Sequence, residues 1–189
     1  LSSLLKKPIS KSATQLVLYE LATRYLATEQ LLRLNELLKS YSAQTLGDYE
    51  KIRTAVSMVV ENTDPGKGYM NIAYFMNRSL RQVPGPYYGH KLHVKQQEAD
   101  QCDRTFKQQG IKDPYYYYKK ALTYFDDGKS DIEAKVLHFL VYCHKPQDVI
   151  RDCRWMPYDT GNPSKAWFDK LHRKYAGTVW AENTPYHYK

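Results

Sequence analysis

The spacing of the apolar residues is the feature that most constrains what this chain can fold into. Apolar side chains recur every three or four residues over most of the sequence, which places them on one face of an α-helix. Alternation of apolar and polar residues, the pattern of a half-buried strand, is short everywhere. The sequence therefore predicts an all-α fold, either an irregular helical bundle or an array of helical hairpins.

Apolar stripes define the helices expected in the first half of the chain. Ser12 or Thr14 can cap the first helix, and a second stripe continues it, either straight on or after a break near Thr28. Asp48 is expected to start the next helix, which a turn at residues 64–68 (DPGKG) would end before a helix at 69–80. The stripes are Val17, Leu18, Leu21, Tyr25 and Leu26; Leu31, Leu34, Leu38 and Tyr41; Tyr49, Ile52, Val56 and Val60; and Ile72, Phe75, Met76 and Leu80.

Breaker residues set the expected domain organisation. The segment 83–89 (VPGPYYG) is the strongest breaker and should be a loop that divides an N-terminal bundle from a C-terminal helical-hairpin part. We expect a basic N-terminal extension at residues 1–11, a helical domain at 12–176 and an extended aromatic tail at 177–189.

A block of tyrosines opens the hairpin part. Pro114 suits the first position of a helix, and Tyr115–Tyr118 follow it. Because successive helical residues are about 100° apart, the rings point in different directions. Tyr118 falls on the core stripe with Leu122 and Phe125, so the other rings are expected to form an aromatic edge for a neighbour.

The segment 99–140 carries the features of a repeated helical hairpin. Its sequence resembles the pentatricopeptide-repeat family, although the turn of that family is altered here to GIKDP at 110–114. The resemblance implies an organellar protein with possible RNA contacts at the repeat junctions. Any antiparallel helical pair shares this periodicity, and that alternative stays open. The matching residues are Ala99, Phe106, Tyr118, Leu122, Gly128, Asp131 and Ala134.

The cysteines and histidines predict neither a disulfide nor a metal site. Cys143 and Cys153 have the spacing of half a twin Cys-x9-Cys motif, but on one helix they would lie about 15 Å apart, beyond disulfide reach. Pro146 could fold the second segment back, although nothing in the sequence requires it. With Cys102, they are expected to be free thiols in a reducing compartment. His138 and His144 lack the paired short spacings of zinc ligands, so no metal or cofactor is predicted.

Catalytic motifs are absent from the sequence, which contains no phosphate-binding glycine loop, zinc-protease motif or nucleophile elbow. Asp126 and Asp127, beside Gly128, are typical of a turn and helix cap. An enzyme would require these carboxylates to converge with His138 in a cleft. The prediction is that the protein is not an enzyme.

Composition indicates binding rather than catalysis. The net charge of +8 favours RNA, anionic lipid headgroups or acidic protein partners, and 18 tyrosines against 5 phenylalanines suit surfaces that are both apolar and wet. No apolar run approaches the roughly 18 residues of a membrane span. The interface candidates are Tyr87, Tyr88, Tyr115, Tyr116, Lys119, Lys120, Arg151, Arg154, Trp155, Trp167, Arg173, Trp180, Tyr186 and Tyr188.

These patterns lead to one expected function and one alternative. The start at Leu1, with basic residues and no acid before Glu20, is typical of the region after a removed organellar presequence. We expect a non-enzymatic accessory subunit that docks onto other subunits of a large assembly, most plausibly mitochondrial: an ATP synthase, a respiratory complex or a mitoribosome. The alternative is an RNA- or DNA-binding helical module that uses tyrosine, lysine and arginine surfaces.

Overall fold

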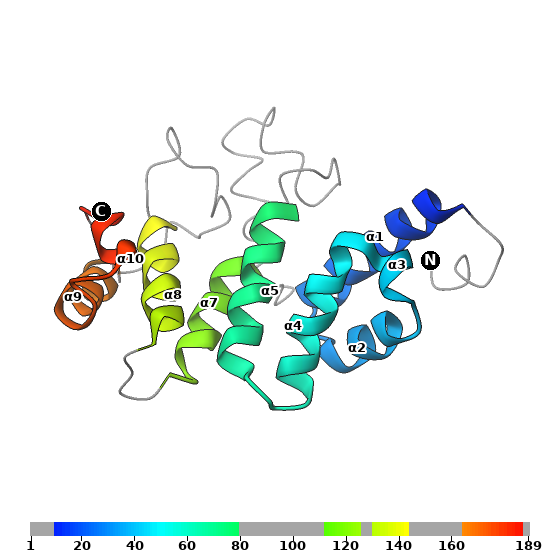
Figure 1. The fold of residues 1–189 in the computed structure, drawn as a ribbon, viewed down its shortest axis with the longest axis horizontal. Helices are drawn as coiled ribbons and strands as arrows, with labels where there is room; N and C mark the ends of the chain where they lie inside the picture. The colour runs from blue at the N-terminus through cyan, green and yellow to red at the C-terminus, as the bar shows by residue number, and fades with distance from the viewer. Residues whose placement is uncertain (1–9, 80–111, 126–129, 144–163, 187–189) are drawn as a thin grey trace, which may run out of the picture.

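Helices stacked side by side make up the structure. The structure, a computed structural model, describes residues 10–79, 112–125, 130–143 and 164–186. Within these ranges there is no strand, and the all-α prediction is confirmed. Figure 1 shows the helices in a row, from α1 and α3 at one end to α9 and α10 at the other.

Contacts between helices follow the order of the chain. α1 packs on α2, α2 on α4, α4 on α5, α5 on α7, α7 on α8, and α8 on α9 and α10, the most extensive contacts being those that α5 makes with α4 and α7. Such a row buries a continuous core through neighbour contacts. The elements are α1 (Lys11–Ala27), α2 (Leu31–Lys39), α3 (Ala43–Leu46), the 3-10 turn η2 (Gly47–Tyr49), α4 (Glu50–Val60), α5 (Pro65–Ser79), α7 (Pro114–Leu122), α8 (Asp131–Tyr142), α9 (Ser164–Lys174) and α10 (Val179–Glu182).

Local capping chemistry sets most helix starts. Ser10, rather than Ser12 or Thr14, caps α1 by accepting a hydrogen bond from Ala13 N. The predicted start of α7 at Pro114 is confirmed, with Asp113 as its cap. The predicted start of α8 at Asp131 is also confirmed.

The turn predicted at residues 64–68 is wrong, because residues 65–68 form the first turn of α5 and Asp64 precedes it. Pro65 occupies the first helical position, where its missing N–H costs nothing. Asp64 caps the helix, since its Oδ1 accepts a hydrogen bond from Lys67 N at 3.1 Å. Proline and glycine therefore mark a helix start here, and the chain reverses just before them.

Gly68 allows α4 and α5 to approach closely. A Cβ atom on Gly68 would lie 2.7 Å from both Ala55 O and Val59 Cγ2 of α4. At Gly66 the close neighbour belongs to the residues just after α7, since a Cβ atom there would lie 2.8 Å from Phe125 Cζ. These glycines serve helix packing rather than a turn, which the local sequence does not reveal.

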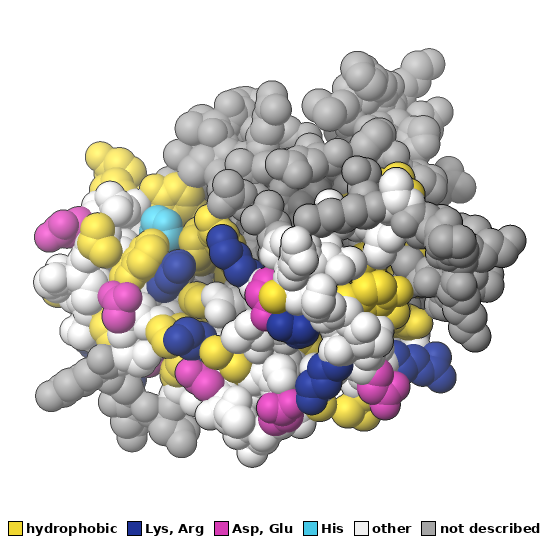
Figure 2. Space-filling model, turned by 45° about the vertical axis from the view of Figure 1, so that its right-hand side comes forward, with side chains coloured by type: hydrophobic (Ala, Val, Ile, Leu, Met, Phe, Trp, Pro, Cys, Tyr) yellow, Lys and Arg dark blue, Asp and Glu magenta, His cyan; other side chains and the backbone are white. Residues whose placement is uncertain are grey.

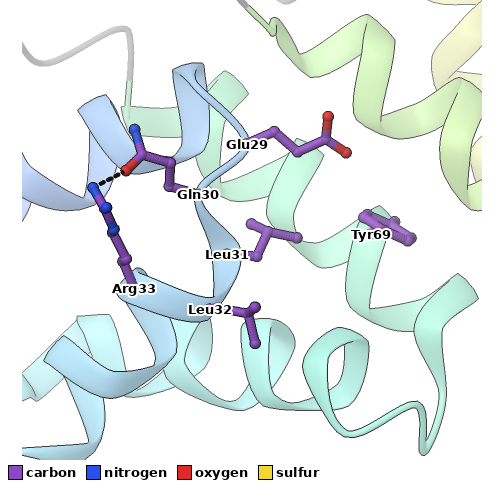
Figure 3. Close-up of a pocket in the computed structure, with 6 residues that line it drawn as sticks. All are labelled: Glu29, Gln30, Leu31, Leu32, Arg33 and Tyr69. Atoms are coloured by element: carbon purple, nitrogen blue, oxygen red, sulfur yellow. Dashed lines mark hydrogen bonds between the residues drawn. The ribbon is translucent and has the colours of Figure 1, made fainter.

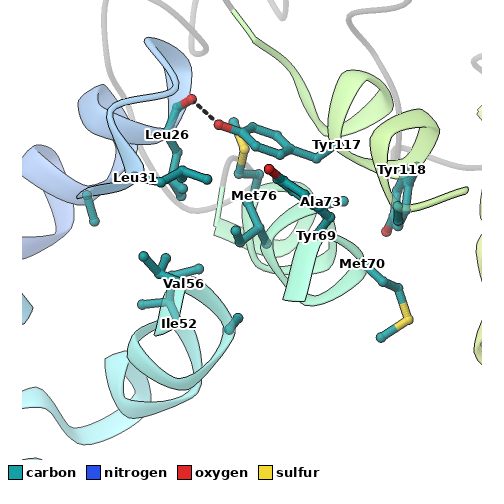
Figure 4. Packing of buried hydrophobic residues seen from close by; sticks show 14 of the residues in the cluster. Leu26, Leu31, Ile52, Val56, Tyr69, Met70, Ala73, Met76, Tyr117 and Tyr118 are labelled. Atoms are coloured by element: carbon teal, nitrogen blue, oxygen red, sulfur yellow. Dashed lines mark hydrogen bonds between the residues drawn. The ribbon is translucent and has the colours of Figure 1, made fainter. Parts of the chain in front are cut away.

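The core runs along the row of helices and centres on α5 and α7. Tyr117 and Tyr118 are the largest of its fully buried side chains, and both rings lie among residues of neighbouring helices (Figure 4). Tyr118 was expected on the core stripe; the burial of Tyr117 as well follows from the packing of α7 against both α5 and the end of α1. A smaller cluster joins α8, α9 and α10: Ala134, Leu137, Leu171, Tyr175 and Ala181.

The segment predicted as an extended tail contains a short helix. Residues 179–182 form α10, which Thr178 caps and which packs against α8 and α9. Trp180 Nε1 donates to Asp131 Oδ1 at 2.9 Å, and Tyr142 Oη donates to Asn183 O at 2.6 Å. These bonds and the burial of Ala181 hold the segment on the helical row.

The Gly68 contact generates the first prediction. Gly68→Ala is expected to lower the free energy of unfolding by about 1–3 kcal/mol, because the added methyl group clashes with backbone of α4. Gly177→Ala is the matched control, since a Cβ there meets nothing within 4 Å and should leave stability unchanged. Urea denaturation of both variants measures the effect, and equal stabilities would contradict the proposed packing role.

Candidate functional site

The last four carbonyl groups of α1 all accept hydrogen bonds. Such carbonyls have no partner inside their own helix and must find donors elsewhere. Residues just after the helix supply donors to three of them: Thr28 N to Arg24 O at 3.1 Å, Gln30 N to Tyr25 O at 2.8 Å and Glu29 N to Leu26 O at 3.0 Å. The last, Ala27 O, accepts from Lys112 N at 2.7 Å, just before α7 begins.

Tyr117 makes a second bond from α7 to this end of α1. Its Oη donates to Leu26 O at 2.6 Å, and both residues are fully buried (Figure 4). The Tyr117 ring also stacks on Tyr69 of α5, with centroids 6.2 Å apart. Because a buried phenol needs a hydrogen-bond partner, the carbonyl of Leu26 makes full burial of this ring possible.

Glu29 completes the connection between α1 and α7. Its φ of 55° lies in the left-handed region, which is uncommon for a residue other than glycine. The carboxylate accepts a hydrogen bond from Tyr116 Oη at 2.7 Å and forms an ion pair with Lys120 Nζ. We call the bonds of Ala27, Leu26 and Glu29 to α7 the α1–α7 junction.

The junction holds Glu29 and Lys120 in their charged forms. Partial burial raises the pKa of Glu29, but the hydrogen bonds from Lys120 and Tyr116 outweigh it and lower that pKa overall. Desolvation likewise opposes the charge on Lys120, and the bond to Glu29 raises the Lys120 pKa above its usual value. Within the junction, the negative charge of Glu29 is therefore already balanced by the positive charge of Lys120.

A groove of about 680 Å³ lies beside the junction, between the α1–α2 corner and α5. Figure 3 shows Leu31 and Leu32 between the Gln30–Arg33 pair on one side and Tyr69 on the other. Leu32 is 67% exposed, whereas Tyr69 is only 5% exposed. The ring of Tyr124 lies beside that of Tyr69, with centroids 5.5 Å apart, and is exposed like Leu32. The groove thus has an apolar floor and an exposed leucine at its rim.

Cations outnumber carboxylates around this groove. Arg33 Nη1 donates to the amide Gln30 Oε1 at 2.9 Å, and no carboxylate of the described residues pairs with Arg33. Lys120 Nζ lies 5.0 Å from the centroid of Tyr69, and Lys112 Nζ lies 4.6 Å from that of Tyr116. Glu29 is the one carboxylate among the residues that line the groove.

Further interface candidates meet between α7 and α9. Tyr115 packs edge-on against Trp167, with centroids 5.6 Å apart, and Lys119 Nζ lies 4.6 Å from the Tyr115 centroid. Burial raises the pKa of Tyr115 to about 12, with a smaller contribution from Asp113. These rings are largely engaged inside the chain rather than displayed.

A cluster at the other end of the row joins α8 to the tail. His138 Nδ1 lies 2.7 Å from Thr184 Oγ1, whose hydroxyl donates to Trp180 O at 2.6 Å. Because that hydroxyl has only one hydrogen, Nδ1 must carry the proton that joins it to His138. Burial and, to a smaller degree, Lys135 lower the pKa of His138 to about 4. His138 is therefore a neutral, hydrogen-bonded histidine.

The predicted interface residues do not form one surface. Tyr116 and Lys120 meet at the junction, while Tyr115, Lys119 and Trp167 meet between α7 and α9. Trp180 lies in the His138 cluster, and Arg173 and Tyr186 are exposed elsewhere in the C-terminal part. Their role in binding stays a prediction. The remaining candidates lie outside the described residues: Tyr87, Tyr88, Arg151, Arg154, Trp155 and Tyr188.

Sequence reasoning missed the residues that line the groove. Leu32 does carry a signal, because it is an apolar residue off the stripe formed by Leu31, Leu34 and Leu38 and so must face away from the core. Arg33 and Tyr69 carry no such signal, since their positions depend on how α2 and α5 pack.

The expectation of three free thiols is wrong for Cys143. This residue is disulfide-bonded, and its partner is not among the described residues. Cys143 caps the C-terminal end of α8, so the distance argument, which assumed a helix that continues past it, does not apply. A disulfide is typical of an oxidising compartment.

Several other segments singled out in the sequence lie outside the described residues. Asp126 and Asp127, the 83–89 loop and residues 99–111 of the repeat-like segment lie outside the described residues. In the described part, no group of three histidine, cysteine or acidic side chains is placed to hold a metal ion. None of the helices described there has both the length and the apolar character that a membrane crossing requires.

Comparisons with protein-family models, with curated proteins and with solved structures find no match to this chain. The resemblance to pentatricopeptide repeats therefore stays a prediction of the sequence. Residue roles at the site rest on the geometry described above.

The Tyr117 bond generates the second prediction. Tyr117→Phe is expected to lower the free energy of unfolding by about 1–2 kcal/mol, because it removes a buried hydrogen bond and keeps the ring. Tyr124→Phe, which alters an exposed ring, is the control and should change stability by less than about 0.5 kcal/mol. Urea denaturation measures the free energy of unfolding of both variants. If Tyr117→Phe is as stable as wild type, the bond contributes nothing to stability.

His138 generates a pH prediction. Its pKa falls from 6.5 in the unfolded chain to about 4 in the folded one, so the unfolded chain binds more protons between these values. Stability contributed by neutral His138 is thus lost as the pH falls from about 6.5 towards 4. Wild type should lose about 1–2 kcal/mol more than His138→Gln between pH 7 and pH 4.5, after allowance for partial exposure. The free energy of unfolding is measured by denaturation at both pH values. If wild type and His138→Gln lose the same amount of stability between them, the prediction is wrong.

Proposed function

We propose that this chain is a non-enzymatic accessory subunit that docks onto other protein subunits of a larger assembly. The observation that carries the proposal is the groove beside the α1–α7 junction, with exposed Leu32 at its rim and Arg33 next to it. Arginine is enriched at protein interfaces, and covering an exposed apolar side chain such as Leu32 with a partner removes its surface from water.

The rigidity of the groove supports docking. Its Glu29 end is tied to α7 by Tyr116 and Lys120, and its α5 side holds Tyr69 stacked on the buried Tyr117. A site whose walls are already ordered loses little conformational entropy when a partner binds. Such pre-organisation favours a permanent docking role. That the assembly is mitochondrial remains the expectation from sequence.

The distribution of charge favours a protein partner over a nucleic acid. On the face in Figure 2, the lysine and arginine side chains of the described residues alternate with acidic and hydrophobic ones and form no continuous basic stripe. A nucleic-acid site usually tracks the phosphates with clustered cations.

The native mass of the chain tests this function. The 22.2 kDa chain is expected to migrate on native gels of gently lysed source cells with a mass several times its own, and nuclease treatment should leave that mass unchanged. Cross-linking followed by mass spectrometry identifies the partners. Migration as a free monomer would contradict the proposal, and collapse of the complex on nuclease treatment would favour the alternative below.

One observation favours nucleic-acid binding as a second candidate. Lys135 Nζ lies 5.6 Å from the Tyr74 centroid and 5.3 Å from that of Trp180, so a cation sits between aromatic rings on the α5–α8–α10 face. Rings with nearby cations can stack on single-stranded bases. Titrating a single-stranded RNA oligonucleotide at several salt concentrations tests it. Binding that weakens steeply with salt, and less steeply in Lys135→Ala, would support this candidate; no binding at low salt would exclude it.

A further inference from the structure

We infer that the groove between the α1–α2 corner and α5 binds a segment of a partner protein that presents a large apolar side chain next to acidic residues. The inference rests on the proposed docking function and names the partner chemistry of the same site.

The lining calls for an apolar side chain. Leu31 and Tyr69 form the apolar floor, and Leu32 borders it at 67% exposure (Figure 3). A single exposed leucine needs no explanation, but this one stands at the edge of a groove of about 680 Å³. That volume lies within the range of roughly 300–1,000 Å³ in which proteins hold ligand groups. Burying Leu32 under a partner side chain would remove its apolar surface from water.

The charges call for acidic neighbours. Arg33 is exposed and is hydrogen-bonded only to the neutral amide of Gln30 among the bonds described, so its guanidinium can still donate to a carboxylate. Lys112 adds positive charge on the α7 side, because it lies over the Tyr116 ring and acts on Glu29. Glu29 does not cancel this attraction, because Lys120 and Tyr116 already engage both of its oxygens. Glu36, the next acidic residue of α2, does not line the groove.

The same geometry disfavours a nucleic acid in this groove. Base stacking needs an open aromatic face, and the ring that lines the groove, Tyr69, is only 5% exposed. Among the residues that line the groove, Arg33 is the one cation and lies beside exposed Leu32, whereas a nucleic-acid site tracks several phosphates with clustered cations. A protein segment with one apolar side chain and flanking carboxylates could pack that side chain on the apolar floor and Leu32, and pair a carboxylate with Arg33.

Peptide selection on the purified full-length chain tests the inference. A display library of random twelve-residue peptides is panned against the chain, and the enriched peptides are resynthesised with a fluorophore for anisotropy titrations. Enriched sequences should carry a large apolar residue with aspartate or glutamate within a few positions. No enrichment, or enrichment of basic peptides, would overturn the inference.

Variants locate the binding. Leu32→Asp and Arg33→Glu are each expected to weaken the enriched peptides by roughly tenfold or more, a loss of about 1.4 kcal/mol. Leu16→Asp is the matched control, because Leu16 is 66% exposed on α1, does not line the groove and should bind the peptides like wild type. Far-ultraviolet circular dichroism confirms that each variant keeps its helices. Equal binding by Leu32→Asp and Leu16→Asp would overturn the inference.

The outcomes separate this inference from the proposed function. If the chain still enters its native assembly with both groove variants, docking stands and the groove assignment fails. If the wild-type chain is a free monomer in cells, the docking function itself fails. If single-stranded RNA displaces the labelled peptide from the wild-type chain, and only the groove variants bind that RNA more weakly, the groove would be assigned to nucleic acid instead.

Discussion

The structure depends on the hydrogen bonds that residues at the start of α7 and within it donate to the last carbonyl groups of α1. A helix that ends inside a protein leaves carbonyl groups that must be hydrogen-bonded, and α1 obtains two of its donors from residues far along the chain. Lys112 N bonds to Ala27 O, and Tyr117 Oη bonds to Leu26 O at a fully buried position. These bonds tie the start of α7 to the end of α1, while extensive packing on α5 places α7 in the row of helices.

The groove is a consequence of this arrangement. Holding the α1 end against α7 places Glu29 in a left-handed conformation and turns the chain into α2, so that Leu32 and Arg33 face outward beside Tyr69. The ion pair with Lys120 then offsets the cost of the unusual backbone and leaves Arg33 available. One structural requirement, capping α1, therefore creates a surface suited to docking.

Local rules in the sequence predict the helices but not this junction. The start of α7 at Pro114 and of α8 at Asp131 follow from proline and capping preferences within a few residues. Residues 64–68 mislead the same rules, because Gly68 is there for contact with α4, a tertiary requirement. The burial of Tyr117 and the meeting of residues 29–33 with Tyr69 depend on partners up to 91 positions away, which no local pattern encodes.

Amide hydrogen exchange at Lys112 tests the junction most directly. This amide precedes α7 and has no helical partner, so its bond to Ala27 O is what can protect it. In native-state exchange followed by nuclear magnetic resonance, we expect it to exchange at least about a hundredfold more slowly than an unprotected amide, and to open together with α1 and α7. Exchange at the unprotected rate, with α1 and α7 still protected, would contradict the account.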